Sequence, residues 1–552
     1  MFKFLTGLWS KETPNVTAAA ILIGGASLAS RAIGLVRDRL LAGHFGAGPE
    51  LDAYYAAFRL PDFFYQLIIL GALSAGFIPI FTEYLEKRGQ SEAWKLAERV
   101  FTTIALVFGV VCLGLFILAH KLVPYMVPGF SGDQLHTTIA LSRILLISTF
   151  IMGLSAVMGG ILQATRRFLA FSLAPVLYNV GIIIGVLGFA PSFGVSGLAY
   201  GVVLGAGLHF LVQALVAMPL GLKRFGRPSF KDPGVRQILR LMLPRIGGLA
   251  ASQVNMTILL ILASTLSVGS IAVFNFANNL QYVPIGLIGI SFAVAAFPSF
   301  SKLAAAGDIK GLKDSFLTTT HKILFLIVPA TALMLLLRAQ IVRLVLGAGV
   351  FDWDATIRTA DVLAIFVFAL MAHAMIPLLA RAFYALKDTR TPLLVSLFSM
   401  LDVVFLALLL KEPYGLLGLA AAFALDGFAQ FILLWFLLRR RFGHLEGKYL
   451  SKSLGKIILA SIALFGFGWL ARQAVGTVFP LRTFWQVALQ AGAACVLGGG
   501  AFYVVARLLR VAELDDWVRT LKHRLYRQAK ICLLYTSPSP RDRTRSRMPS
   551  SA

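Results

Sequence analysis

The stretches SRAIGLVRD, Ser30 to Asp38, and FRLPDFF, Phe58 to Phe64, decide the fold. They place five charged residues inside two segments that are otherwise apolar enough to lie in a bilayer: Arg31, Arg37, Asp38, Arg59 and Asp62. A charge near the middle of a membrane helix costs roughly 2.5–3.5 kcal/mol on insertion scales. We therefore expect these segments to line a hydrated cavity within the protein, as in a protein that moves a polar solute.

The composition is that of a membrane protein. Of 552 residues, 58% are hydrophobic and 14% are charged, with a mean hydropathy of +0.81. A soluble domain carries about 25% charged residues. Apolar runs of about 20 residues, the length that spans a bilayer, recur along the chain. The sequence predicts an all-α polytopic membrane protein.

We expect fourteen membrane helices from these runs. Their approximate cores are residues 17–42, 54–82, 100–120, 139–162, 170–189, 195–219, 242–265, 271–298, 323–346, 360–384, 392–410, 415–438, 456–475 and 484–508.

The charged loops orient these helices. Lysine and arginine collect after even-numbered helices, as at Arg166 and Arg167, whereas GAGPELD (46–52), after the first helix, has neither. Because positively charged loops stay in the cytoplasm, we expect both termini there. The net charge of +26 lies in short loops and tails, which argues against nucleic-acid binding. Three widely spaced cysteines fit neither a disulfide framework nor a zinc site.

The chain carries an internal duplication. At an offset of about 220 residues, GVSGLA (194–199) matches GLLGLA (415–420), and FIPIFT (77–82) matches FPSFS (297–301). QATRRF (163–168) lies opposite LKDTRTP (386–392) at the same offset. Each copy holds six helices, so the copies share one orientation, as in transporters whose substrate site lies between two parallel repeats.

The predicted organisation is two six-helix lobes in parallel repeat followed by two additional helices. The boundaries are a cytoplasmic segment at 1–15, the first lobe at 16–222, the second lobe at 236–441, helices thirteen and fourteen at 455–509, and a cytoplasmic tail at 510–552. After about residue 532 the tail is rich in Ser, Pro and Arg. Such a composition cannot form a packed element, so we expect it to be disordered or not native coding sequence.

The charges of the first helix fall on one side. Arg31 and Asp38 share a helical face, and Ser30 and Arg37 form the adjoining stripe. One interpretation is an Arg–Asp pair that holds the first two helices together. The other is an anion site, since arginine can grip a phosphate with two parallel hydrogen bonds.

Two carboxylates and an amide lie in the second half. Asn255, Asp402 and Asp426 fall within predicted helices seven, eleven and twelve. Intramembrane carboxylates can hold a cation or carry a proton, and hydrogen bonds between helices are the alternative. No GxxxxGK[ST] loop occurs, so we expect no ATP hydrolysis by this chain.

The motifs SRAIGLVRDRLLAGHFGAG (30–48) and LDAYYAAFRLPDFFYQLIILGALSAGFIPIFTEYL (51–85) resemble the opening of the MurJ/MviN family. The resemblance continues through FPSFSKLAAAGD (297–308), LVLGAGVFDWDAT (344–356) and ARAFYALKDTRTP (380–392), and covers about residues 16 to 508. These are lipid II flippases of the multidrug/oligosaccharidyl-lipid/polysaccharide exporter superfamily. The resemblance implies fourteen helices, a cavity that alternates between the membrane faces, and a groove for the polyprenyl tail at helices thirteen and fourteen.

The family's polar residues carry over by motif. Ser30, Arg31 and Arg37 match the helix-one residues, Asp52 matches the acidic residue that starts helix two, and Arg59 matches the basic residue before LP. We expect these to bind substrate together with Asp38 and Asp62. A sodium site among helices seven, eleven and twelve is also implied, with Asn255 and Asp402 as its candidates.

The sequence differs from the family pattern at two positions that the resemblance assigns to phosphate binding. The family's arginine four residues after LP is Tyr65 here, and its acidic–arginine pair in helix eight is Asn278–Asn279. We therefore treat Tyr65, Asn278 and Asn279 as secondary cavity candidates.

The sequence and the resemblance together predict a flippase, not an enzyme. We expect it to flip lipid II by alternating access in the bacterial cytoplasmic membrane as a monomer, among membrane lipids and without a cofactor. A sodium or proton gradient or the membrane potential would drive it. The alternatives are a flippase for another polyprenyl-diphosphate glycan, a drug or cation antiporter of the same superfamily, and a non-transporting scaffold.

Overall fold

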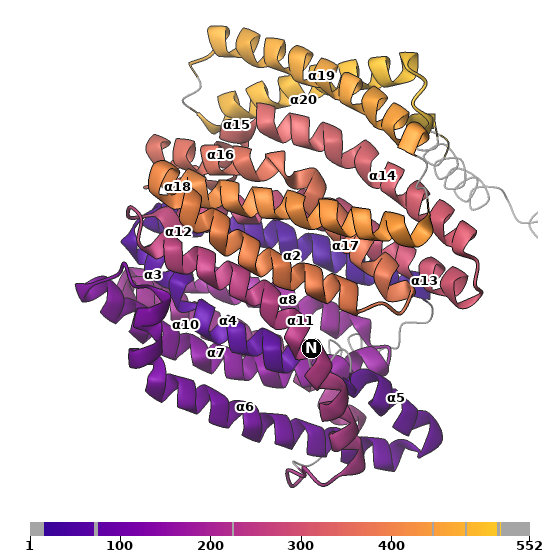
Figure 1. Ribbon diagram of the computed structural model, residues 1–552. Helices are drawn as coiled ribbons and strands as arrows, with labels where there is room; N and C mark the ends of the chain where they lie inside the picture. The colour runs from indigo at the N-terminus through magenta and orange to yellow at the C-terminus, as the bar shows by residue number, and fades with distance from the viewer. Residues whose placement is uncertain are drawn as a thin grey trace, which may run out of the picture.

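The computed structural model describes residues 16–70, 76–222, 226–443, 447–480, 483–515 and 519. The predicted cytoplasmic segment 1–15 and the tail beyond about residue 532 lie outside the described residues. Within them the regular elements are all helical (Figure 1). This confirms the all-α fold class.

The first half contains α2 (Val16–Phe45), α3 (Pro49–Ala57), α4 (Arg59–Tyr65), the π-helical turn η1 (Gln66–Leu70), α5 (Ile78–Lys87), α6 (Gln90–Met126), α7 (Gly132–Ala164), α8 (Phe168–Ile184), the π-helical turn η3 (Gly185–Phe189), α9 (Ala190–Phe193) and α10 (Val195–Gly221). The second half contains α11 (Pro233–Ser264), α12 (Ser270–Pro284), the π-helical turn η4 (Ile285–Ile290), α13 (Ser291–Ala305), α14 (Ile309–Leu336), α15 (Arg338–Leu346), α16 (Trp353–Phe368), α17 (Leu370–Ala385) and α18 (Arg390–Phe442). Two further helices follow, α19 (Gly447–Val478) and α20 (Phe484–Leu508).

Many of these helices are long and apolar enough to cross a bilayer. Among the described residues nine helices meet that criterion, and α16 with α17, bent by 46°, forms a tenth candidate. Within the described residues, each of the fourteen predicted ranges falls on a helix or on a run of short helices. The charged segments α2 and α3 to α5 are not among the nine. A count of fourteen spans is compatible with this arrangement.

Helix α18 consists of two helices joined by a turn. Gly415 has φ 54° and ψ −127°, which breaks the helix, and glycine adopts such angles without steric cost. Ser399, before the turn, donates a hydrogen bond of 2.8 Å from its hydroxyl to Oδ2 of Asp426, after it. The two halves therefore lie side by side, as Figure 1 shows.

The backbone repeats the turns of the first half in the second half. Positive-φ residues recur about 220 positions apart, at Gly194 and Gly415 and at Arg166 and Lys387. The π-helical turns η1 and η4 recur at the same offset. This agrees with the offset of the sequence repeats, whereas the exact lobe boundaries stay a prediction.

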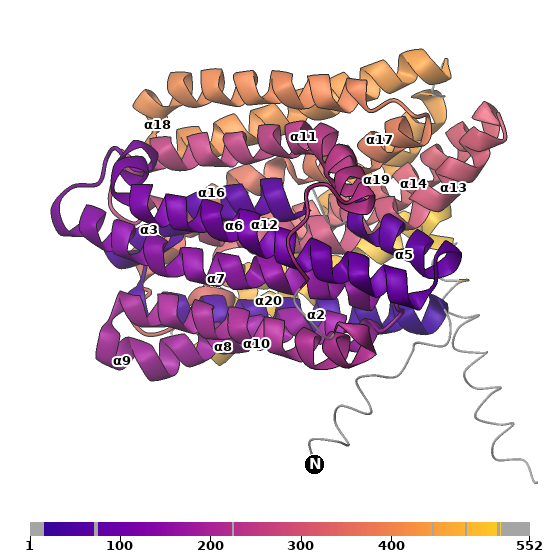
Figure 2. The ribbon, with the colours of Figure 1, turned by 90° about the horizontal axis from the view of Figure 1, so that it is seen from below.

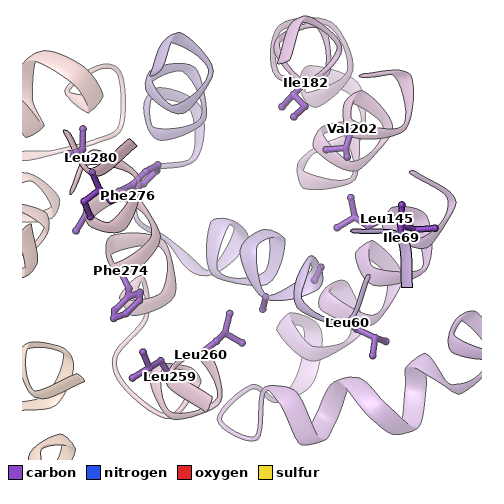
Figure 3. Close-up of a cluster of buried hydrophobic side chains, with 14 of the residues drawn as sticks. Leu60, Ile69, Leu145, Ile182, Val202, Leu259, Leu260, Phe274, Phe276 and Leu280 are labelled. Atoms are coloured by element: carbon purple, nitrogen blue, oxygen red, sulfur yellow. The ribbon is translucent and has the colours of Figure 1, made fainter. Parts of the chain in front are cut away.

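One apolar core cluster extends through both lobes. In Figure 3, Leu145, Ile182 and Val202 represent this cluster on α7, α8 and α10, and Phe274 and Leu259 represent it on α12 and α11. The second lobe is completed by contacts of α18 with α11 and α17. Figure 2 shows α18 along one side of the molecule and α8 and α10 along the opposite side. Helices α19 and α20 pack on each other. Helix α19 also packs against α14, and α20 against α15.

Glycines allow a close helix contact in the first lobe. Gly181 and Gly185 face Gly201 and Gly205, four-residue spacings that let two membrane helices approach closely. A Cβ on Gly185 would lie 2.6 Å from Cα of Gly201. This contact fixes α8, which carries part of the site described next, against α10.

Candidate functional site

Arg37 of α2 is held by two side chains. Its Nε and Nη2 donate to Oδ1 of Asp38 at 3.0 and 2.8 Å, and its Nη1 donates to Oδ1 of Asn179 at 3.0 Å. Asn179, on α8, donates in turn to the Ser30 hydroxyl at 3.3 Å. The guanidinium therefore has a fixed position.

Asn179 is a site residue that the sequence analysis did not single out. It is buried and its Nδ2 also donates to the carbonyl of Pro175 at 3.0 Å. The sequence signal that could have identified Asn179 is its position one turn after a proline in the apolar segment SLAPVLYNVGIII. Its partner lies 142 residues away, and a single sequence does not reveal that proximity.

A chain of hydrogen bonds continues from the first lobe into the second. The other oxygen of Asp38 accepts from Nδ2 of Asn279, on α12, at 3.2 Å. Asp38 itself is buried, with 4% of its surface exposed, and the contact is partly buried. The Asp38 carboxylate thus connects α8, through Arg37, to α12.

Two polar pockets adjoin this chain. One, of about 240 Å³, is lined by Ser30, Arg31, Gly34, Arg37, Asp38 and Tyr282 among others. The other, of about 190 Å³, is lined by Arg37, Tyr54, Arg59, Asp62, Tyr178 and Asn275 among others. Arg37 and Asn279 line both pockets. Six of the seven predicted substrate-binding residues therefore meet at one place between the lobes.

Asp52, the seventh, does not line either pocket. Its carboxylate accepts hydrogen bonds from the backbone N–H groups of Gly269 at 2.6 Å and Ala272 at 2.8 Å. These N–H groups belong to the first turn of α12, where a negative charge is favourable because of the helix dipole. The structure gives Asp52 the role of capping a helix of the opposite lobe.

Other contacts join the lobes at the same end. The N–H of Val350 donates to the carbonyl of Gly43 at 3.0 Å, and Arg39 donates from Nη1 to the carbonyl of Leu344 at 2.6 Å. The end of α2 and the start of α3 are therefore bound to the second lobe.

Of the secondary candidates, Asn279 alone reaches the pockets. Tyr65 lines neither pocket. The amide oxygen of Asn278 accepts from Nε2 of Gln281 at 3.0 Å, a contact within α12.

The candidate cation residues lie in a separate cluster of the second lobe. Asn255 of α11 donates to the Ser399 hydroxyl at 3.1 Å, and Ser399 donates to Asp426. Asn255 is thus connected to Asp426 rather than to Asp402. Three oxygens in this region are buried without a hydrogen-bond partner in the described part of the chain: Oδ1 of Asn255, Oδ2 of Asp402 and Oδ1 of Asp426. Oxygen donors of this kind fit a hard cation such as sodium.

Comparisons with known proteins agree on one family. The family described as "Lipid II flippase MurJ" matches residues 41–485. A protein of Rhizobium meliloti (strain 1021), named a probable lipid II flippase MurJ, is 30% identical over 519 residues, covering 91% of this chain and 95% of its own length. A protein of Rhizobium tropici with the same name is 28% identical over 527 residues, covering 91% and 96%.

Solved structures show the same fold. A structure titled "Lipid II flippase MurJ, inward closed conformation" superposes with a TM-score of 0.73 at 22% identity, covering 89% of this chain and 99% of the other. A multidrug resistance MATE family transporter of the MOP superfamily, in an inward-facing conformation, gives a TM-score of 0.66 at 20% identity, covering 78% and 99%. With a family match over most of its length, and with its polar site between two repeated lobes, the chain belongs to the lipid II flippase MurJ family.

Proposed function

We propose that this protein is a transporter that flips lipid II across the bacterial cytoplasmic membrane. The observation that carries the proposal is the meeting of Arg31, Arg37 and Arg59 between the two lobes. Membership of a family whose relatives are named lipid II flippases supports it. The site is one for binding and release, and no bond of the lipid is broken.

The three arginines suit a diphosphate. Guanidinium groups bind phosphate oxygens through charge-assisted hydrogen bonds and keep their charge at any physiological pH. Asp38 fixes Arg37 by two hydrogen bonds to one oxygen, so less rotamer entropy is lost when the anion binds. Ser30, next to Arg31 in the larger pocket, supplies a neutral donor.

Alternating access follows from the contacts between the lobes. The lobes are joined where α2 ends, through Asp52 and through Gly43 with Val350. With both termini in the cytoplasm, as the charged loops predict, this joined end faces outward. Transport then requires these contacts to break as the lobes reorient around the site.

A coupling cation would bind in the second lobe. The unpaired oxygens of Asn255, Asp402 and Asp426 support this assignment, with sodium or a proton as the ion. The membrane potential is the other candidate driving force, since the arginines would move with the lobes relative to the membrane field.

A second candidate is a flippase for another polyprenyl-diphosphate glycan. It is favoured by Asn279, which lines both pockets at a position where the resemblance leads us to expect an arginine. A drug or cation antiporter of the superfamily is less well supported, because three arginines line the pockets that such a cationic cargo would enter.

The test is complementation of a strain depleted of its lipid II flippase. We expect Arg31→Ala and Arg37→Ala each to abolish growth while membrane insertion, followed by immunoblot of the membrane fraction, is unchanged. Normal growth with both arginines replaced would overturn the proposal. Native mass spectrometry of the purified protein with lipid II, and with a glycan of different sugars on the same diphosphate carrier, separates the two flippase candidates.

A further inference from the structure

Arg31 lies against a glycine of the opposite lobe. The glycine is Gly286, in the π-helical turn η4. A Cβ built on Gly286 would be 2.7 Å from Cζ of Arg31 and 2.5 Å from its Nη1, and its third near neighbour is Nη2. All three atoms belong to the guanidinium group. The guanidinium therefore covers the space where a side chain of residue 286 would be.

Arg31 is also a lining residue of the larger pocket. Arg31 lines it together with Arg37 and Asp38, but Arg37 alone of the two arginines is paired with that carboxylate. In the described part of the chain, no hydrogen bond or ion pair joins Arg31 to an acceptor. Its donors are thus available to an anion in the pocket.

The local backbone explains why residue 286 approaches so closely. Pro284, at the end of α12, has no N–H and cannot continue the regular helix pattern. The chain widens into η4, and the Ser291 hydroxyl donates to the carbonyl of Gly286 at 2.9 Å. Glycine is the residue that lets a backbone approach another group this closely.

Gly286 differs from its neighbour Gly289 in what a side chain would meet. A Cβ on Gly289 would lie 2.8 Å from Cα of Ala374, a backbone atom of α17. The obstacle at Gly286 is the far end of one flexible side chain, which can move. A methyl group there leaves the packing of the helices in place but displaces the guanidinium.

We propose that Gly286 is a positioning residue for the diphosphate. Because it has no side chain, its backbone forms a seat on the second lobe, against which the guanidinium of Arg31 packs beside the pocket. This inference rests on the proposed function, in which Arg31 binds a lipid diphosphate. Because Arg31 belongs to the first lobe and Gly286 to the second, the seat depends on the relative position of the lobes.

The experiment measures binding of undecaprenyl diphosphate, which carries the diphosphate without a glycan, to the full-length protein in nanodiscs. The variants are Gly286→Ala, Arg31→Ala and the double variant. Gly188→Ala is the matched control, because Gly188 lies in the π-helical turn η3 and a Cβ there would come no closer than 3.9 Å to Cγ2 of Ile184.

We expect Gly286→Ala to weaken binding about tenfold, the scale of one charge-assisted hydrogen bond, with an unchanged thermal midpoint. Gly188→Ala should bind as the wild type does. In the Arg31→Ala background Gly286→Ala should have no further effect, which a general structural lesion would not show. Wild-type binding by Gly286→Ala, or an equal loss in both backgrounds, overturns the inference. If the wild type does not bind undecaprenyl diphosphate at all, both the proposed function and this inference are wrong.

Discussion

The carboxylate of Asp38 and the amide of Asn279 join the two lobes at the centre of the protein, with 3.2 Å between Oδ2 and Nδ2. The same carboxylate holds Arg37 through its other oxygen. A change at residue 279 therefore acts both on the contact between the lobes and on the neutralisation of Asp38.

Asn279→Asp places a second carboxylate beside Asp38. Two like charges in a buried setting repel, and the hydrogen bond is lost, so we expect the unfolding free energy to fall by about 1–3 kcal/mol and complementation to fail. Asn279→Arg, which can pair with Asp38, should retain growth. The thermal midpoint and growth of the depleted strain check both variants, and equal behaviour of Asp and Arg at this position would contradict the argument.

Asn179→Leu removes the acceptor for Nη1 of Arg37. The guanidinium then keeps Asp38 as its partner but loses its fixed orientation, and we expect about tenfold weaker binding of a lipid diphosphate. Asn179→Asp retains an acceptor at the same place and serves as the control for the hydrogen bond. Binding to the protein in nanodiscs is the measurement, and the prediction fails if the Leu variant binds as tightly as the Asp variant.

Asp52→Ala removes the cap that the first lobe provides for α12. Losing a helix cap costs about 1 kcal/mol. Asp52 caps α12 only while the lobes are joined at this end, so the substitution destabilises that state. The state in which the lobes are separated at this end therefore becomes more populated. Spin labels at Glu50→Cys and Val268→Cys, both at exposed positions on opposite lobes, report the separation. We expect a longer distance population to grow in the Asp52→Ala background, and an unchanged distance distribution would contradict the role of the cap.

Gly201→Ala tests the contact between α8 and α10. The new Cβ would overlap the backbone of Gly185, and overpacking of this kind costs about 1–3 kcal/mol. Gly207→Ala, on the same helix and with no atom within 4 Å of its Cβ, gains the same helix propensity without the overlap. We expect the thermal midpoint in detergent to fall for the first variant and to stay level or rise for the second.

Asp388, in the loop between α17 and α18, makes stability depend on pH. Burial alone would raise its pKa, but hydrogen bonds from the N–H and hydroxyl of Thr391 and the charge of Arg441 outweigh burial and lower it below the usual 3.8. A lowered pKa in the folded state stabilises the protein above the pKa of the unfolded state, and this is lost as the pH falls through the folded value.

We therefore expect wild type to have a higher thermal midpoint than Asp388→Asn at pH 7. The two midpoints should converge as the pH falls below about 4. A difference that is the same at pH 7 and pH 3 would show that the charge of Asp388 does not stabilise the loop.

Several features could be predicted because they depend on neighbours along the chain. Apolar runs predict the membrane helices, and the repeated motif GxxGLA aligns Gly194 with Gly415, where the structure has turns. Helical spacing predicts that Arg31 and Arg37 lie on adjoining faces of the first helix. Asn179 and Gly286 could not be found in this way. Their roles come from partners in other helices, and a buried amide or a glycine in an apolar segment has many other uses.

The sequence by itself determined an all-α membrane protein built from a duplicated unit, with arginines inside apolar segments. It could do so because hydropathy, charge and repetition are properties that can be read along the chain. The tertiary structure decided which of those charges are neutralised and which are free. It brings Asn179 and Asn279 to Arg37 and Asp38, assigns Asp52 to a helix of the other lobe, and leaves Arg31 on Gly286. In several cases the partners are more than a hundred residues apart in the sequence. The packing of the lobes determines which residues become partners, and no local sequence pattern encodes that packing.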